Sequence, residues 1–166
     1  MPKLIKDGAI ADNLWHTVSI DAAYKDAIAS KAEQILVPFN MWQEHKAELK
    51  ASGIEIGVWL DSEDDPYELS DEVGNLPLIA VNFPIFRDGR AFSSAAILRQ
   101  RLGYTGELRA IGDVLCDQAF YMKKCGINSF ELPDSGHADD FIRAFSDFTD
   151  SYQSTVEVTD PLFRRR

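Results

Sequence analysis

Short apolar runs alternate with amphipathic segments along most of the chain. The runs begin near residues 35, 54, 78, 107 and 129. The run at 78–83 (LIAVNF) is almost continuously apolar, as is typical of a strand buried on both faces. A segment with helical spacing of apolar residues, or with helix-capping residues, follows each run. The pattern therefore predicts five strand–helix units.

Turn and capping residues set the bounds of these units. Asp65-Pro66-Tyr67-Glu68 combines an N-cap with proline at the first helical position, so a short helix is predicted there, ending by Gly74. Asp113 is the predicted cap of a later helix. The other elements predicted are strands at 35–39, 54–60, 78–83, 107–112 and 129–132, helices at 40–50, 92–102, 113–124 and 138–152, and in the first 30 residues a hairpin at 4–10 and a helix at 21–30.

The alternation predicts a single α/β domain with parallel strands and right-handed crossovers. Residues 1–30 would form an N-terminal extension, 31–152 the repeated core and 153–166 a tail. Two architectures fit: an open three-layer sheet of about five strands with helices on both faces, or a partial β/α barrel. Five units are too few to close an eight-stranded barrel, so we favour the open sheet. In both architectures ligands bind at the carboxyl ends of the strands.

The formal net charge of −10 makes nucleic acid an improbable partner, because its binding rests on neutralising phosphates. Seven carboxylates and no basic residue occupy 61–72 (DSEDDPYELSDE). This stretch is either a solvated face or a docking surface that steers a basic partner. The candidate docking residues are Asp61, Glu63, Asp64, Asp65 and Glu68.

Several functional classes lack their motifs. No apolar run is long enough to span a membrane, and no secretory signal is present, so we expect a cytoplasmic protein. Dinucleotide-binding, P-loop and nucleophile-elbow motifs are missing, and the three histidines show no metal-ligand spacing, so we identify no cofactor or metal site. Cys116 and Cys125 lie nine residues apart on one predicted helix, too far for a disulfide, and are expected to be reduced.

The loop after the third predicted strand carries the densest set of polar candidates. Arg87, Asp88 and Arg90 lead into Ser93 at the start of a helix. Arginine forks and free helix amides together bind anions, so a small-anion site is one hypothesis. Internal salt bridges are the alternative. Further candidates that the fold could bring near this loop are Arg99, Arg101, Arg109, Asp113 and Asp117. Arg109 lies within a buried strand and needs an acidic partner, for which Asp113 and Asp117 are the candidates.

The segment 83–132 (FPIFRDGRAFSSAAILRQRLGYTGELRAIGDVLCDQAFYMKKCGINSFEL) closely resembles the signature of the bacterial domain-of-unknown-function family 934. The early IKDG at 5–8 and Trp15 also fit, and Lys124 stands where the family usually has arginine. The resemblance implies a role in sulfite reduction, because the family is labelled a probable oxidoreductase of that pathway.

Two functions follow as expectations. The first is an accessory protein of sulfur assimilation that docks to sulfite reductase or its electron donor through the acidic stretch. The second is a small enzyme that binds a sulfur oxyanion or sulfonated metabolite at the arginine-rich loop. The missing cofactor motifs favour the first, and the polar cluster at the expected ligand edge favours the second.

Overall fold

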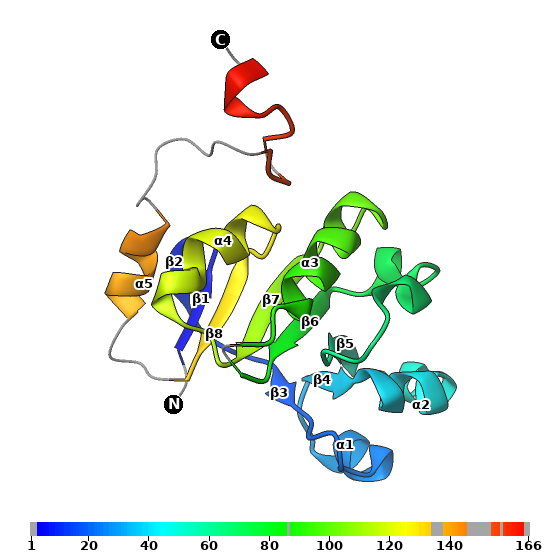
Figure 1. Cartoon of the computed structure of the whole chain (residues 1–166). Helices are drawn as coiled ribbons and strands as arrows, with labels where there is room; N and C mark the ends of the chain where they lie inside the picture. The colour runs from blue at the N-terminus through cyan, green and yellow to red at the C-terminus, as the bar shows by residue number, and fades with distance from the viewer. Residues whose placement is uncertain (1–2, 86, 134–137, 146–153, 157, 165–166) are drawn as a thin grey trace.

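The computed structural model describes residues 3–85, 87–133, 138–145, 154–156 and 158–164. Eight strands form one sheet in the order β2-β1-β8-β7-β6-β5-β4-β3 (Figure 1). The strands are β1 (Lys3–Lys6), β2 (Ala9–Ala11), β3 (His16–Thr17), β4 (Gln34–Pro38), β5 (Glu55–Leu60), β6 (Leu78–Phe83), β7 (Glu107–Gly112) and β8 (Ser129–Leu132). The helices are α1 (Tyr24–Ala29), α2 (Phe39–Ala51), α3 (Arg90–Gln100), α4 (Ala119–Lys124) and α5 (Ala138–Ala144), with short 3₁₀ turns η1 (Pro66–Leu69), η2 (Val73–Asn75), η3 (Cys116–Gln118) and η5 (Leu162–Arg164).

The parallel core agrees with the prediction. Strands β4 to β8 lie within one or two residues of the predicted bounds, and β6 is a central strand paired in parallel with β7. The predicted hairpin is also present, but it is not a separate extension. Its first strand, β1, pairs antiparallel with β8 and extends the sheet, while β3 extends the opposite edge in parallel with β4.

The connection between β2 and β3 requires the sheet to curl. These strands are the two edges of the sheet, and a flat sheet of eight strands would hold its edges roughly 34 Å apart. The chain passes from Ala11 to His16 in five residues, which span at most about 19 Å. The sheet is therefore curled into a half-barrel, and residues 12–15 cross its inner face.

The described helices all pack on the outer face of the half-barrel. The large apolar core joins outward residues of the strands to buried residues of α1 to α5, such as Ala27, Trp42, Leu98, Met122 and Phe141. A smaller inner cluster contains strand residues and Trp15, and no described helix residue belongs to it. The prediction of helices on both faces is thus wrong, and the partial-barrel alternative is confirmed. Strands β3 to β8 follow chain order, and right-handed crossovers in one direction place every helix on the same face.

Several predicted helix bounds differ. The helix predicted at 21–30 is observed over Tyr24–Ala29, and that predicted at 92–102 is observed two residues earlier, over Arg90–Gln100. The helix predicted at 113–124 begins later, as η3 followed by α4, and Leu115 rather than Asp113 precedes its first turn. The helix predicted at 138–152 is observed as α5, Ala138–Ala144, while residues 146–152 lie outside the described part of the chain.

Candidate functional site

The carboxyl ends of β5, β6 and β7 bring three polar loops together. Asn82, at the end of β6, donates from Nδ2 to Asp61 Oδ1 at 3.1 Å, and so joins the loop after β5. Gly112 ends β7 with φ of 88°, and a Cβ there would lie 2.5 Å from both Asn82 Oδ1 and the Phe83 carbonyl. Only glycine allows this close approach. The Asp113 amide then donates to the Phe83 carbonyl at 2.7 Å, so Asp113 stands in a turn and not at a helix cap.

The Arg90 guanidinium forms hydrogen bonds with two carboxylates at this edge of the sheet. Nε and Nη2 donate to the two oxygens of Asp88 at 3.0 and 2.7 Å, and Nη1 donates to Glu63 at 2.5 Å. Asp88 also accepts from the Arg90 backbone amide, at 3.1 Å. These hydrogen bonds hold the pKa of Asp88 well below its usual range and raise that of Arg90. The helix start and arginine predicted to bind an anion therefore hold the chain's own Asp88 carboxylate.

Arg99 ties helix α3 to two neighbouring loops. Its Nε donates to the Gly126 carbonyl at 2.8 Å, and its Nη1 donates to the carbonyls of Tyr104 and Gly106 at 2.7 and 2.8 Å. Nη2 reaches Asn128 Oδ1 at 3.2 Å. Burial lowers the pKa of Arg99. The hydrogen-bond donors of Arg99 thus bind mainly the backbone carbonyls of these two loops and fix the loops to α3.

Arg109 lies inside the half-barrel, toward the amino ends of the strands, and is only 1% exposed. Its Nε and Nη2 donate to Glu107 Oε1 at 3.0 and 2.7 Å, and its Nη1 donates to Asn13 Oδ1 at 3.0 Å. The expected partners, Asp113 and Asp117, lie beyond the opposite end of β7 and do not pair with it. Glu107 is two residues earlier on the same strand, so strand periodicity places it on the same face as Arg109.

The remaining anion-site candidates are dispersed. Arg87, Ser93, Arg101 and Asp117 are exposed, and Asp113 is half-buried. Within the described part of the chain, the side chains of Arg87 and Arg101 make no hydrogen bond or ion pair. The structure therefore brings Asp88 and Arg90 together, places Arg87 near them in the loop, and separates Arg99 and Arg109 from that loop.

The acidic stretch forms a rigid surface because part of it binds the body. Asp64 Oδ2 accepts the Asp61 amide at 2.7 Å, and Asp65 caps η1 by accepting the Tyr67 amide at 2.9 Å, as predicted. Lys46 and Lys50 of α2 both donate to Glu72, at 2.7 and 2.9 Å. Gln43 donates to Glu68. The stretch is therefore built onto α2.

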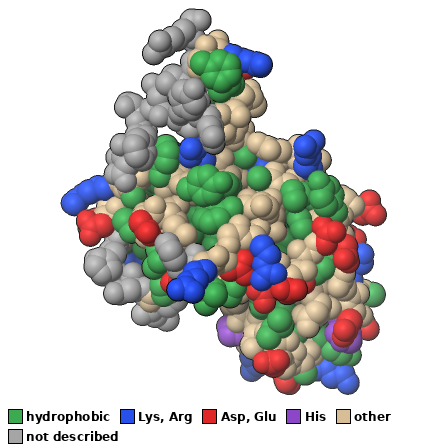
Figure 2. Space-filling view, viewed as in Figure 1, with side chains coloured by type: hydrophobic (Ala, Val, Ile, Leu, Met, Phe, Trp, Pro, Cys, Tyr) green, Lys and Arg blue, Asp and Glu red, His purple; other side chains and the backbone are tan. Residues whose placement is uncertain are grey.

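The docking candidates divide into two groups. Asp61 and Asp64 are half-buried and hold the loop, whereas Glu63, Asp65 and Glu68 are exposed. Figure 2 shows acidic side chains toward the right-hand side of the body, where η1 and α2 lie in Figure 1. The acidic surface is defined here as Glu63, Asp65, Tyr67, Glu68 and Asp71, whose side chains are exposed.

Tyr67 is the residue of this surface that sequence reasoning missed. It is 49% exposed and stands among the exposed carboxylates. Exposed tyrosines surrounded by polar residues are common centres of protein–protein interfaces. An aromatic residue within an acidic stretch was the signal available in the sequence.

Asp64, which lies beside the acidic surface in the sequence, has a raised pKa. Burial raises the pKa of Asp64, and the charges of Asp61, Glu68 and Glu63 raise it further, against the opposing hydrogen bond from the Asp61 amide. A positively charged group placed here would relieve this repulsion.

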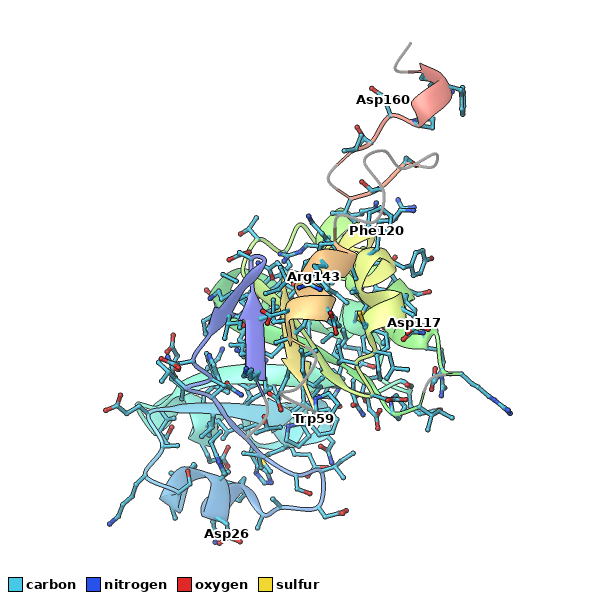
Figure 3. All side chains as sticks on the ribbon, turned by 90° about the vertical axis from the view of Figure 1, so that its left-hand side faces the viewer. Asp26, Trp59, Asp117, Phe120, Arg143 and Asp160 are labelled. Carbon is cyan, nitrogen blue, oxygen red and sulfur yellow. The ribbon has the colours of Figure 1, made fainter. Side chains whose placement is uncertain are left out.

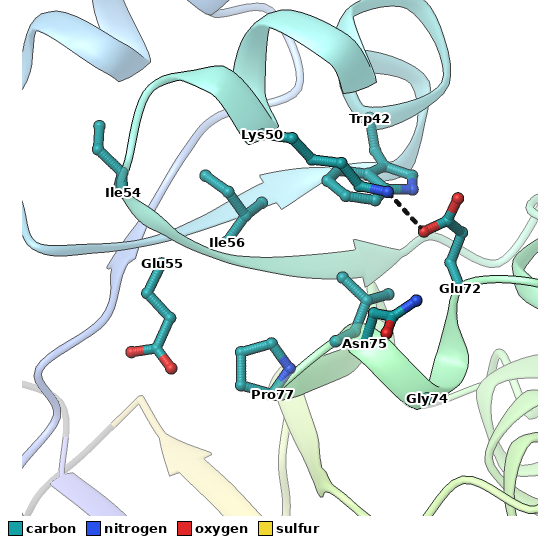
Figure 4. A pocket seen from close by; sticks show the side chains of 10 residues that line it. Trp42, Lys50, Ile54, Glu55, Ile56, Glu72, Gly74, Asn75 and Pro77 are labelled. Atoms are coloured by element: carbon teal, nitrogen blue, oxygen red, sulfur yellow. Dashed lines mark hydrogen bonds and ion pairs between the residues drawn. The ribbon is translucent and has the colours of Figure 1, made fainter.

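A cavity lies at the amino end of β5, away from the three polar loops (Figure 4). It has a volume of about 440 Å³, and its walls include Trp42 and Ile56. Its charged side chains are already paired: Lys50 with Glu72 at 2.9 Å, and Glu55 with Gln34 at 2.6 Å. The cavity is separate from the carboxyl edge and contains none of the predicted site residues.

The histidines, cysteines and carboxylates are the groups that could supply a metal site or a reactive thiol. No cluster of three or more histidine, cysteine, aspartate or glutamate residues suited to a metal occurs in the described ranges. No disulfide joins Cys116 and Cys125. Burial raises the pKa of Cys125 to about 11, so its reactive thiolate form is scarce at neutral pH.

The model of a family described as "Bacterial protein of unknown function (DUF934)" matches residues 57–163, from β5 through η5. The match contains the signature segment 83–132, while the IKDG motif and Trp15 precede it. No curated protein matches the chain. Within the described residues, no helix is both long and apolar enough to cross a membrane.

Proposed function

The chain belongs to the bacterial family of unknown function DUF934, and from this premise we propose that it is an accessory protein of assimilatory sulfite reduction. In this proposal its acidic surface docks onto a basic face of sulfite reductase or of that enzyme's electron donor. The pathway is the one that the resemblance of segment 83–132 implies. The mode of action comes from the acidic surface itself.

The observation that carries the proposal is a rigid acidic surface that includes an exposed aromatic side chain, Tyr67. The stretch is held by α2 and by Asn82, so it loses little conformational freedom when a partner binds. The carboxylates of Glu63, Asp65 and Glu68 would accelerate encounter with a basic partner. Tyr67 would supply apolar contact and slow dissociation.

The enzyme alternative rests on fewer residues. Arg87 is the exposed arginine of the predicted anion loop that makes no ion pair with the described residues, whereas Arg90, Arg99 and Arg109 are engaged internally. Calorimetric titration of sulfite into the wild type and into Arg87→Ala tests this alternative. Binding heat that disappears in the variant would favour it over docking alone.

The docking proposal is tested by surface plasmon resonance with sulfite reductase and with its electron donor. A triple variant, Glu63→Gln, Asp65→Asn and Glu68→Gln, keeps the shapes of the side chains and the cap at residue 65. We expect association to slow about tenfold at low salt and the difference to shrink at high salt, since exposed charges are then screened. Tyr67→Ala should mainly accelerate dissociation.

The matched control removes the same charge from another part of the surface. Asp21→Asn, Asp26→Asn and Glu33→Gln alter exposed carboxylates in and around α1. Figure 3 shows Asp26 on this helix, at the opposite end of the molecule from Asp160. We expect the control triple to change association less than twofold. If both triple variants slow association equally, net charge alone explains the effect and the proposed docking surface is overturned.

A further inference from the structure

The segment 158–164 stands away from the body of the protein. Its base is held by a hydrogen bond from the Val156 amide to the Lys124 carbonyl, 3.2 Å, at the end of α4. Beyond this point the chain leads outward through Asp160 to η5 in two views at right angles (Figures 1 and 3). We call Val158–Arg164 the basic arm, which Arg165 and Arg166 follow in the sequence.

The basic arm carries an aromatic residue that its own fold does not bury. Phe163 is 62% exposed, and its described ring contact is with the neighbouring Arg164 guanidinium, 5.8 Å from the ring centre. A three-residue helical turn has no face large enough to bury a phenylalanine. An exposed aromatic residue followed by three arginines is a ligand-like sequence for an acidic, aromatic surface.

The acidic surface has the complementary chemistry. Glu63, Asp65 and Glu68 offer exposed carboxylates to arginine forks, and Tyr67 offers an aromatic face to a guanidinium or to Phe163. Burial is the main cause of the raised pKa of nearby Asp64, and the repulsion by Asp61, Glu68 and Glu63 that adds to it would fall as arginines approach. In a chain with 17 basic and 27 acidic residues, the three consecutive arginines at 164–166 are the densest positive charge in the sequence.

The two surfaces do not meet within one molecule. The arm leaves from α4, while the acidic surface lies on η1 against α2, on the other side of α3 (Figure 1). The arm also points away from the body. We propose that the basic arm of one copy docks on the acidic surface of a second copy. This inference uses the surface of the proposed function, and it implies that an arm and a basic partner protein compete for that surface.

Sedimentation equilibrium of the full chain tests the proposal over a range of concentrations. We expect reversible self-association at about 50 mM salt that weakens at least tenfold at about 500 mM, because the contact is small and charged. Replacing Arg164 and Arg165 by glutamine should weaken it about tenfold, whereas Arg143→Gln, an exposed arginine on α5, should have little effect.

A charge-swap pair tests whether the arm and the acidic surface contact each other directly. One variant carries Arg164→Glu and Arg165→Glu at the end of the arm, and the other carries Glu63→Lys and Glu68→Lys on the acidic surface. Each variant alone should be monomeric, because its arm and surface repel. Their mixture should associate again, because the reversed arm meets the reversed surface.

A mixture that stays monomeric would overturn the proposal, as would a wild-type chain that is monomeric at low salt. Closure of the arm onto its own molecule would show as compaction independent of concentration, and would also overturn it. These experiments do not involve sulfite reductase. If self-association is not found, the docking proposal is still tested separately by surface plasmon resonance. Partner binding without self-association would overturn this proposal alone, and self-association without partner binding would overturn the docking proposal alone.

Discussion

The inner face of the half-barrel and the acidic surface both pair arginine or lysine with carboxylates, but their surroundings differ. Inside, Arg109 is almost fully buried, and Glu107 accepts hydrogen bonds from both Arg109 and Lys6, the latter at 2.6 Å. Outside, Arg90 pairs with Glu63, whose side chain is 83% exposed. Water screens the outer pairs, so their charges stay available to partners, whereas the inner pairs can only hold the fold.

The inner network also explains how the curl is held closed. Asn13, in the segment that crosses the inner face, accepts from Arg109 and donates to Glu131 on β8 at 3.0 Å. Nearby, Trp15 packs on the inner apolar cluster, and the Trp59 indole donates to the Val18 carbonyl at 3.1 Å. Figure 3 shows Trp59 within the curl. The segment that crosses the inner face is thus joined to β7 and β8 through Asn13 and to the inner apolar cluster through Trp15.

The largest effect should come from breaking the inner pair. Glu107→Gln removes the carboxylate that hydrogen-bonds the buried Arg109 and leaves Glu131, 4.0 Å from Arg109 Nη1, as its remaining ion pair among the described residues. We expect a loss of about 3–5 kcal/mol in the free energy of unfolding. Urea denaturation at neutral pH measures it. Glu63→Gln, which breaks an exposed pair, is the matched control and should change stability far less. Similar losses in the two variants would remove the distinction between the two regions.

Arg99 provides an intermediate case, half-buried and bonded to backbone. Arg99→Ala leaves the carbonyls of Tyr104, Gly106 and Gly126 without this donor, and should destabilise the chain by about 2–4 kcal/mol. Arg99→Lys should recover only part of this loss, because an ammonium lacks the planar fork. Thermal and urea unfolding check both variants, and full recovery with lysine would contradict the fork's role.

The pH dependence of stability should distinguish the regions as well. Burial alone would raise the pKa of Glu107, but the hydrogen bond from Lys6 and the charge of Arg109 outweigh it and hold the pKa below its ordinary value. Its contribution is therefore complete above the unfolded pKa of about 4.3 and is lost as the pH falls through the lower folded value. The stability difference between wild type and Glu107→Gln should narrow below about pH 4. A constant difference down to pH 3 would contradict this assignment.

The smallest effect has the opposite sign. The raised pKa of Asp64 means that its charged form destabilises the folded state above that pKa. Asp64→Asn keeps an oxygen for the Asp61 amide and removes the charge, so it should stabilise the chain at pH 7 by less than about 1 kcal/mol, since solvent screens a half-exposed carboxylate. The gain should vanish in acid, where Asp64 is protonated. Destabilisation at pH 7 would show that the hydrogen bond outweighs the repulsion.

Much of the fold could be predicted from local pattern. The strand at 78–83 and its parallel neighbour at 107–112 have the bounds expected, because uninterrupted apolar character and flanking turn residues are local signals. Which face each crossover helix covers is not a local signal. It depends on strand order, so the three-layer prediction failed although the elements were mostly right.

The candidate site shows the same division at the level of side chains. The sequence indicated that the loop at 87–90 combines arginine with a helix start, which suits an anion. It did not indicate that Asp88 would be that anion, because an Asp-Gly pair also reads as an ordinary turn. Similarly, Arg109 needed a partner, and the choice among nearby carboxylates depended on which face of the sheet each occupies.

The sequence by itself determined the parallel strand–helix core and the acidic stretch with its capped turn, because each follows from spacing and residue type over a few positions. Only the tertiary structure decided that the sheet curls, that Arg109 lies inside it with Glu107, and that Tyr67 stands among exposed carboxylates. These features join segments far apart in the chain. Their energies depend on burial, which changes the strength of the same ion pair several-fold and is set only when the whole sheet has closed.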